Sequence, residues 1–396
     1  MPETDGTNEA RRPDSVRAHN TALVLGLLRD GSQISRADLA RETGLSLPTI
    51  MDIVDQLCDR GLARMAGNGA PTGGRPPRLY EFIPGGRTAI GVSVGTVTTT
   101  AAVTDLNAAV LHELREPSRL HEGPDACVEQ VLRLIDALLD HCVDRHGDVL
   151  GIGLAVAAHL RDSDGRSLHL WDDARRQPLD LRALVAERHK VTVEIDNYAK
   201  AVAVGEHRFG SARGHRHVLC VVLQDGVGAA LITDGTLYRG WDGGAGQFGA
   251  SVVRGPAGEH TNLDAVAGAF GIVARAAAAI PSGRPPPRTV AAVCAAARAG
   301  EAFAVQVLRE VGEVLGEAIH NARVLLDSEV VVLTGPTVVA AGDHLVGPAA
   351  RAAATDGKPR MTTGSLGERA GAIGAVALLL RNSFIDPPRH LPARRT

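Results

Sequence analysis

The arginines are the residues of this sequence with the clearest chemical role. Residues 60–88 carry five Arg against one acid, although the whole chain has a formal net charge of −3. Arg75 and Arg78 lie in the stretch GNGAPTGGRPPR, and Arg64 precedes it. One guanidinium group can bind two phosphate oxygens at the same time. An Arg in an extended G-R-P element can also enter a narrow minor groove of DNA. The segment predicts DNA contacts, but Arg75 could equally lie in a solvated turn, and the scarcity of Lys could reflect genomic base composition.

Two other groups of residues could bind a small molecule. Asp196 and Asn197 come just before a helical run that starts near Tyr198. Their short polar side chains suit either hydrogen bonds to a ligand's hydroxyl groups or capping of that helix, and both interpretations stay open. Between two strand-like runs, Gly226, Val227 and Gly228 could turn backbone N–H groups toward an anion.

The arginine segment follows three short helices. Apolar residues at helical spacing predict the first helix over residues 19–30, after a polar tail over residues 1–18. A second helix follows Ser35 and stops at Gly44, and Ser46 caps a third. The last two resemble a helix-turn-helix, and the alternative is a helical hairpin without a ligand. Four apolar side chains would hold the two helices at their angle: Leu39, Leu45, Ile50 and Val54.

The third helix would be the recognition helix of a winged domain over residues 19–83. Thr49 could touch a thymine methyl group or a base edge, and Asp52 could accept a hydrogen bond from a cytosine amino group. Asp52 would also repel phosphate, so base recognition is the weaker part of the DNA prediction. Residues 62–83 predict two strands around a wing tip. The predicted DNA-binding residues are Ser46, Thr49, Asp52, Arg64, Arg75 and Arg78.

Composition excludes several classes of protein. The chain has 396 residues, 44% of them hydrophobic, which is typical of a globular protein of two or three domains. Its apolar runs, such as residues 375–380, are far shorter than the roughly 20 residues of a membrane-spanning helix. The five cysteines form no C-x-x-C pair, so neither a disulfide framework nor a cysteine zinc site is expected. We therefore expect a cytoplasmic, nucleoid-associated protein with no membrane partner.

The larger C-terminal part alternates strands with helices. Strand-like runs cover residues 89–106, Val149–Val156 and residues 217–235. Helical runs follow them, including Ala302–Leu326. This alternation predicts an α/β domain.

The sequence resembles the ROK family of repressors, open reading frames and sugar kinases. The resemblance covers roughly residues 19–385 and rests on the segments VEIDNYAKAVAVGEHRFG, DGVGAALITDG and GAGQFG, a final VVLTG and GAIGAV series, and a helix-turn-helix before them. It implies a two-lobed, actin-like domain over residues 84–396 that binds an effector and forms a homodimer or homotetramer. The smaller lobe would span about residues 88–195 plus the C-terminal helix, and the larger about residues 196–365.

Three departures from the kinase pattern indicate that no residue is catalytic. Ser93 stands where the family has the Asp that organises metal and nucleotide phosphates. Tyr198 stands at the position of the general base, and a phenol with a pKa of about 10 is a poor base at neutral pH. Asp225 precedes the second glycine loop, where a carboxylate is unfavourable beside phosphate.

The sugar-binding positions have changed as well. Gln247 and Ala250 replace the acid and the imidazole of the family's G-E-I-G-H, and the cysteine-rich zinc loop is replaced, so neither a metal nor another cofactor is expected. His260 is expected to be a solvated side chain rather than a ligand. Tyr198 and Phe248 would make the cleft more apolar than a sugar site. The predicted effector-binding residues are Asp196, Asn197, Tyr198, Gln247 and Asp264.

These observations predict a sequence-specific transcriptional regulator, a repressor that binds a double-stranded DNA operator. Its kinase-like domain would be catalytically inactive and would sense a small-molecule effector, sugar-like or altered. One alternative is an ATP-dependent sugar kinase with an accessory DNA-binding domain. A second is a regulator that has lost its effector.

Overall fold

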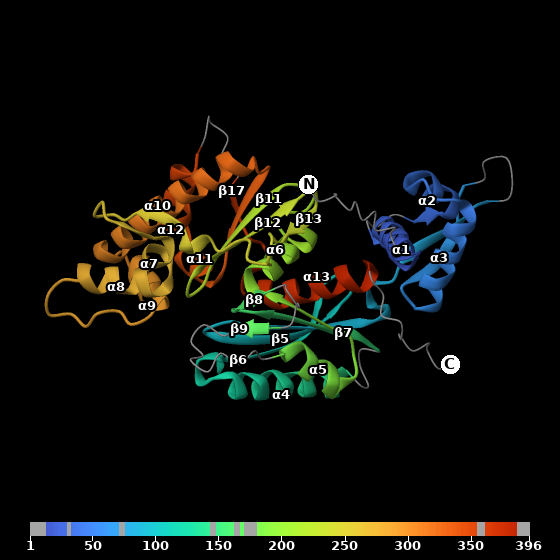
Figure 1. The fold of residues 1–396 in the computed structure, drawn as a ribbon, viewed down its shortest axis with the longest axis horizontal. Helices are drawn as coiled ribbons and strands as arrows, with labels where there is room; N and C mark the ends of the chain where they lie inside the picture. Colours follow the sequence, from blue (N-terminus) through green and yellow to red (C-terminus); the bar gives the residue numbers. More distant parts are fainter. Residues whose placement is uncertain are drawn as a thin grey trace, which may run out of the picture.

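The computed structural model places a winged helix at one end of the molecule and two lobes beyond it (Figure 1). It describes residues 13–29, 33–70, 76–142, 148–161, 167–169, 180–354 and 361–385. The first helix begins at Pro13, so the predicted tail over residues 1–18 is wrong from that residue onward. Residues 1–12 lie outside the described residues.

The winged helix forms as the sequence predicts. Ser35 and Ser46 accept hydrogen bonds from the backbone N–H groups of Asp38 and Thr49, and Gly44 ends the second helix at a φ of 70°. The strand order of the sheet is β1-β3-β2. The elements are α1 Pro13–Arg29, β1 Ile34–Ser35, α2 Arg36–Thr43, α3 Leu47–Asp59, β2 Ala63–Asn68 and β3 Arg78–Phe82.

The small lobe is built on a five-stranded sheet of order β10-β7-β4-β5-β6, in which the β10-β7-β4 part is parallel. Helix α13 lies on one face of the sheet and α4 on the other (Figure 1). The predicted strand pair of residues 89–106 is confirmed as β4 and β5. The elements are β4 Thr88–Val94, β5 Thr98–Asp105, β6 Val110–Pro117, α4 Pro124–Cys142, β7 Val149–Val156, β8 His159–Arg161, β9 Ser167–His169, α5 Leu181–His189, β10 Val193–Asn197 and α13 Ala370–Ile385.

The large lobe has a second five-stranded sheet, of order β13-β12-β11-β16-β17. Successive side chains of β11 face opposite sides: Cys220 and Val222 pack toward α6, whereas Val221 packs into the core around α10. The elements are α6 Tyr198–Phe209, β11 Val218–Leu223, β12 Val227–Thr233, β13 Thr236–Tyr238, β14 Val252–Arg254, β15 His260–Asn262, α7 Leu263–Ala267, α8 Ala269–Ala279, α9 Val290–Arg298, α10 Ala302–Leu326, β16 Val330–Thr334, α11 Pro336–Ala341, α12 Asp343–Ala352 and β17 Met361–Thr363.

Helix α13 lies directly on the backbone of the small-lobe sheet. A Cβ atom added to Gly91 of β4 would lie 2.1 Å from the carbonyl oxygen of Ala372, and one added to Gly153 of β7 would lie 1.9 Å from that of Ala375. Side chains at these two positions would hold the helix away from the sheet. The glycines therefore permit the close approach of α13.

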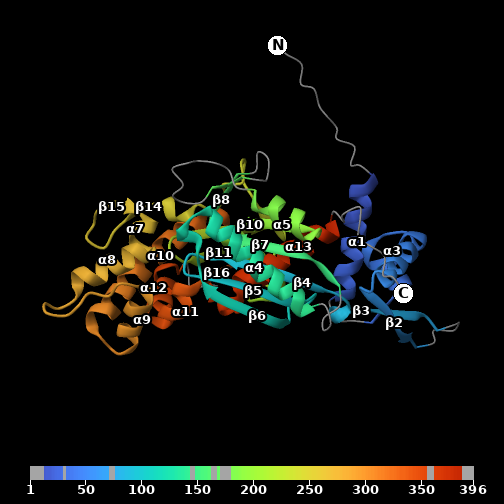
Figure 2. The same ribbon diagram turned by 90° about the horizontal axis from the view of Figure 1, so that it is seen from below.

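The other end of α13 reaches the winged helix. Val376, Leu379 and Leu380 of α13 share one hydrophobic core with apolar side chains of α1, including Leu25 and Leu28. Both views show α13 running from the middle of the molecule toward α1 (Figures 1 and 2). The winged helix and the small lobe are thus joined by packed side chains as well as by the chain connection.

Within the described part of the chain, no single helix has the length and apolar character to span a membrane; α9 and α10 meet these criteria only as a pair, which is bent by 115°.

Candidate functional site

The first turn of α3 carries two of the predicted DNA-binding residues. The hydroxyl oxygen of Ser46 accepts a hydrogen bond from the backbone N–H of Thr49 at 3.3 Å, and the two hydroxyl groups lie 2.8 Å apart. Asp52, one turn later, pairs with Arg17 of α1 at 2.5 Å and accepts a hydrogen bond from Gln56 at 3.0 Å. These three side chains are on the exposed end of α3, but each is already hydrogen-bonded within the protein.

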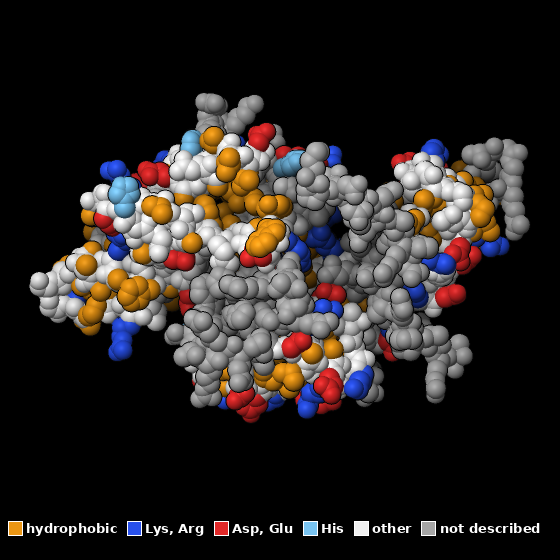
Figure 3. Space-filling view, viewed as in Figure 1, with side chains coloured by type: hydrophobic (Ala, Val, Ile, Leu, Met, Phe, Trp, Pro, Cys, Tyr) orange, Lys and Arg blue, Asp and Glu red, His pale blue; other side chains and the backbone are white. Residues whose placement is uncertain are grey.

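Two apolar side chains of α3 that the sequence analysis missed are more exposed than Thr49. Leu47 and Met51 are 47% and 44% exposed. Figure 3 shows hydrophobic side chains at the outer edge of the winged helix beside basic and acidic ones. Apolar side chains in a major groove can contact thymine methyl groups. The sequence reasoning considered only polar candidates on this face, although the alternation of apolar residues along α3 already marks both as lying off its buried stripe.

The wing arginines differ in their surroundings. The Arg64 guanidinium donates to the Glu81 carboxylate at 2.7 Å, and this bond, with a second from Gln33, lowers the pKa of Glu81. Arg78 is exposed at the start of β3, and no ion pair joins it to another described residue. Arg75 lies outside the described residues. Of the wing residues that are described, Arg78 is the arginine most available to a phosphate.

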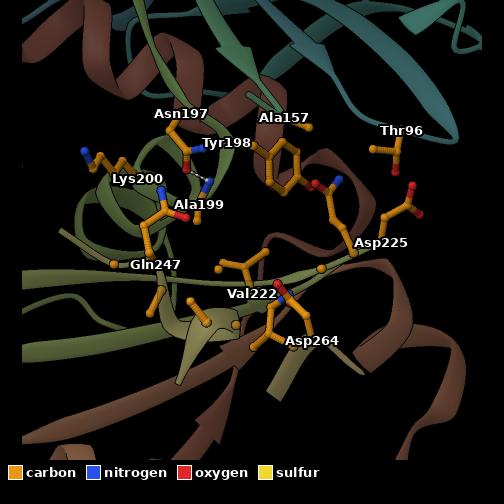
Figure 4. Close-up of a pocket in the computed structure, with 18 of the residues that line it drawn as sticks. Thr96, Ala157, Asn197, Tyr198, Ala199, Lys200, Val222, Asp225, Gln247 and Asp264 are labelled. Atoms are coloured by element: carbon orange, nitrogen blue, oxygen red, sulfur yellow. Dashed lines mark hydrogen bonds between the residues drawn. The ribbon is translucent and has the colours of Figure 1, made fainter. Parts of the chain in front are cut away.

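A cavity of about 950 Å³ lies between the two lobes. Figure 4 shows Asn197, Lys200 and Gln247 on one side of it and Thr96 and Asp225 on the opposite side. The small lobe contributes the turn η2, Leu120–Glu122, and the large lobe contributes α6, α7 and the loop between β11 and β12. Its polar lining side chains are Thr96, His121, Asn197, Tyr198, Lys200, Gln224, Asp225, Gln247 and Asp264.

Tyr198 lines this cavity at the first position of α6. Its ring is buried, and burial raises the pKa of the phenol to about 12. An alanine at position 371, at the start of α13, would bring a Cβ within 2.1 Å of the Ser93 hydroxyl and 2.6 Å of the Tyr198 ring. Ser93 and Tyr198 thus pack against Gly371, and the phenol stays protonated at neutral pH.

The two residues before Tyr198 have separate roles. The side-chain oxygen of Asn197 accepts a hydrogen bond from the Ala199 N–H at 2.9 Å, so Asn197 caps α6 and also lines the cavity. Asp196 is buried, its carboxylate lies 2.6 Å from the Arg239 guanidinium, and it is not among the lining residues. Asp196 is therefore a structural ion-pair partner in this structure rather than a cavity residue.

Of the other predicted cleft residues, some line the cavity and others do not. Gln247 and Asp264 line the cavity together with Asn197 and Tyr198. Phe248 does not line it; its ring packs against the hydrophobic core of the large lobe, so the prediction that it makes the cleft apolar is wrong. His260 is exposed on β15, and the described residues contain no group of three or more side chains placed to hold a metal ion.

The loop between β11 and β12 is tied to both lobes. The Asp264 carboxylate accepts a hydrogen bond from the backbone N–H of Val227 at 2.6 Å. The Asp225 carboxylate lies 3.8 Å from the His121 ring nitrogen of the small lobe. A Cβ on Gly95 would lie 3.1 Å from the Gln224 side-chain nitrogen, so Gln224 reaches the first glycine turn. The two glycine turns therefore face each other across a space lined by polar and acidic side chains.

Comparison with known proteins identifies this architecture. A model of the ROK family matches residues 89–382. The chain belongs to the ROK family. A second model, winged helix-turn-helix DNA-binding, matches residues 20–64.

The relatives of this ROK protein include named regulators. It is 28% identical to the DNA-binding transcriptional dual regulator NagC of Escherichia coli over 336 residues. This match covers 81% of each chain. It is 29% identical to the xylose repressor of Bacillus subtilis over 235 residues, 59% of this chain and 60% of that one.

Solved structures show the same fold. A ROK family transcriptional regulator, a homolog of the E. coli MLC protein, is 21% identical over 94% of this chain and 97% of that one, with a TM-score of 0.77. A ROK family glucokinase from Streptomyces griseus, solved with glucose and AMPPNP, is 24% identical over 74% of this chain and 98% of that one, with a TM-score of 0.61. The first likeness spans the winged helix and both lobes.

The cavity of this ROK protein contains two basic residues that sequence reasoning missed, His121 and Lys200. Lys200 lines it, although only 4% of this residue is exposed, and its ammonium group donates a hydrogen bond to the carbonyl oxygen of Gly243. The signal was present in the sequence: Lys200 is a single charge in the otherwise apolar first two turns of α6. A charge at such a position is rarely buried without a partner.

Proposed function

We propose that this chain is a transcriptional repressor that binds a double-stranded DNA operator and uses its ROK domain to sense a small molecule. The observation that carries the proposal is the packing of α1 of the winged helix against α13, whose first turn contacts the cavity residue Tyr198. The names of the relatives, NagC and the xylose repressor, support the same role. The protein would act at the nucleoid in the cytoplasm.

The cavity is proposed to be a binding site without catalysis. A carboxylate at position 198 would be needed to take a proton from a sugar hydroxyl, and the phenol there is buried with its pKa raised. Asp225 and Asp264 add negative charge where a nucleotide phosphate would have to lie. The alternative function is that of an ATP-dependent sugar kinase. It predicts that a coupled assay detects ADP formation when the protein is given ATP and hexoses.

Helix α13 gives a physical route between the two sites. A ligand changes DNA affinity only if it binds the DNA-competent and DNA-incompetent arrangements differently. The Gly371 end of α13 lies against Tyr198, and its Leu379 and Leu380 end packs on α1. A shift of α13 on filling the cavity would tilt the winged helix directly. A regulator without an effector would show no such coupling.

We further propose that the protein works as a homodimer or homotetramer. Helix-turn-helix proteins commonly pair so that two recognition helices read half-sites about one helical turn apart. In this arrangement residues 19–83 bind DNA, and residues 84–396 bind the effector and hold the copies together. Light scattering on the purified protein should give a mass of two or four chains.

An electrophoretic mobility shift with the DNA upstream of the protein's own gene tests the proposal. Retardation that survives an excess of unrelated DNA is expected. A matched assay of ATP turnover with hexoses should show none. If the protein fails to retard the upstream DNA even at low salt, the regulator proposal is contradicted.

A further inference from the structure

The start of α3 exposes three apolar side chains. Leu47 and Met51 are 47% and 44% exposed, and Pro48 beside them is exposed as well. Residues four apart lie on the same side of a helix, so Leu47 and Met51 are neighbours one turn apart. Both views place α3 on the side of the winged helix away from the lobes, with α1 in between (Figures 1 and 2). Among the described residues, the lobes therefore leave these three side chains uncovered, and together we call them the apolar patch.

The polar side chains beside the apolar patch are engaged within the protein. The Ser46 and Thr49 hydroxyl groups lie 2.8 Å from each other, and the Ser46 oxygen accepts the Thr49 N–H. One Asp52 carboxylate oxygen accepts a hydrogen bond from Arg17 at 2.5 Å, and the other accepts one from Gln56 at 3.0 Å. The polar groups of this helix end thus have partners already, whereas the apolar patch still has surface to bury.

Arginines of the neighbouring helices balance the acids next to the apolar patch. Arg17 of α1 pairs with Asp52, and Arg36 of α2 pairs with Asp55. The Arg36 guanidinium also lies 4.7 Å from the centre of the Tyr80 ring, which helps to hold it in place. A carboxylate paired in this way repels a DNA phosphate less than a free one does. The start of α3 can therefore approach the duplex despite its acidic residues.

We propose that the apolar patch of α3 reads thymine methyl groups in the major groove, and that base recognition by this helix comes from the patch rather than from Asp52. The inference rests on the proposed function as a DNA-binding regulator. In a helix-turn-helix the N-terminal residues of the second helix contact base edges, and Leu47 and Pro48 are the first two residues of α3. The C5-methyl group of thymine is the apolar group that base pairs present in the major groove. The operator half-site should therefore carry thymines where α3 enters the groove.

Replacement of thymine by uracil tests the proposal, because uracil forms the same base pair and lacks only the C5-methyl group. The probe is the DNA upstream of the protein's own gene, prepared once with thymidine and once with deoxyuridine. The full-length wild type should bind the thymidine form about tenfold more tightly, which is the expected effect of burying two methyl groups. Fluorescence anisotropy at one salt concentration measures both affinities, and unrelated DNA serves as the reference for nonspecific binding.

Substitutions in the apolar patch test which residues make the contact. The double variant Leu47→Ala with Met51→Ala should bind thymidine DNA more weakly than the wild type does, and it should bind the thymidine and deoxyuridine forms equally. Leu111→Ala is the matched control, because Leu111 is also 41% exposed but lies on β6 of the small lobe. It should keep the affinity and the preference of the wild type. Melting temperatures of the three proteins verify that the substitutions leave the fold intact.

Two outcomes would overturn the proposal and leave the proposed function standing. One is equal affinity of the wild type for the two forms of upstream DNA, with unrelated DNA bound more weakly. The other is a preference for thymidine DNA that survives in the double variant, because it would then come from another residue or from DNA shape. If the wild type binds upstream and unrelated DNA equally, the proposed function fails, and this inference falls with it.

Discussion

Position 198 illustrates how one residue changes what a cleft can do. The Tyr198 phenol lines the cavity, but its pKa is raised to about 12 by burial, so it can donate a hydrogen bond and cannot act as a base at neutral pH. Its ring also packs against Gly371 of α13. The same side chain that removes the general base thus gives the cavity a contact with the helix that leads to the winged helix.

Restoring the acid at this position should not restore a kinase. Tyr198→Asp leaves Ser93 and Asp225 in place and buries an unpaired carboxylate, which should cost about 1–3 kcal/mol of stability. A coupled assay should show no ADP formation with ATP and hexoses, and denaturant unfolding should show the loss of stability. ADP formation by this single variant would show that the other two departures are unimportant.

Arg78 is the single residue whose substitution should most directly test DNA binding by the wing. Arg78→Ala should weaken binding to all DNA sequences and lower the slope of log affinity against log salt by about 1, because phosphate contacts release counterions. Fluorescence anisotropy over a salt series measures both. Arg309→Ala, which removes an exposed arginine paired with Glu313 on α10, is the control and should change neither. An unchanged slope in Arg78→Ala would remove the wing from the interface.

The sequence predicted part of the site at this scale. Asp264 was named on the family resemblance, and Asn197 was named because a short polar side chain just before a helix suits a ligand's hydroxyl group; both line the cavity. Asp196 was named for the same reason, but it turns the other way to meet Arg239, which lies 43 residues further along the chain in a different lobe. Local spacing cannot reveal a partner that only the tertiary fold brings close.

At the scale of elements, capping residues and apolar periodicity located the helices of the winged helix to within a few residues, except for the start of α1. Helix α10, Ala302–Leu326, has the predicted bounds. The sequence pattern could not predict where α13 packs. An apolar helix without a polar face is recognisable as buried. Its partners α1, β4 and β7, however, are distant in sequence.

The glycine contacts under α13 give a prediction for this element. Gly153→Ala should destabilise the protein by about 1–3 kcal/mol, because the added methyl group overlaps the Ala375 carbonyl and must push α13 from the sheet. Gly85→Ala, where an added Cβ meets nothing within 4 Å, should be nearly neutral. Denaturant unfolding of the two variants makes the comparison, and equal stability would show that α13 does not lie against β7.

At the scale of the whole molecule, one cation joins three parts of the structure. The Arg29 guanidinium, at the end of α1, lies over the rings of Phe82 in the wing and Phe209 at the end of α6, and it donates to the Leu106 carbonyl at 2.9 Å. Together with the α1–α13 core, this contact fixes the winged helix against the small lobe. The sequence showed the three parts but gave no signal for their contact.

Stability of the whole chain should fall in mild acid. Burial lowers the pKa of His207 in α6 from its ordinary value of 6.5, partly offset by a hydrogen bond to the His215 carbonyl. The unfolded chain therefore takes up a proton at higher pH than the folded one, and the stability from this group is lost as the pH falls below about 6.5. In unfolding experiments, the free energy of unfolding of His207→Gln should fall less steeply between about pH 6.5 and 5 than that of the wild type. An equal fall in the variant and the wild type would show that other groups cause the loss of stability.

Selection from fragmented genomic DNA by the purified protein tests whether the chain recognises a DNA sequence. We expect that a small set of fragments is enriched, that they share one two-fold symmetric motif, and that Arg78→Ala reduces recovery of all of them. Recovery of fragments in proportion to their abundance, with no shared motif, would contradict this expectation.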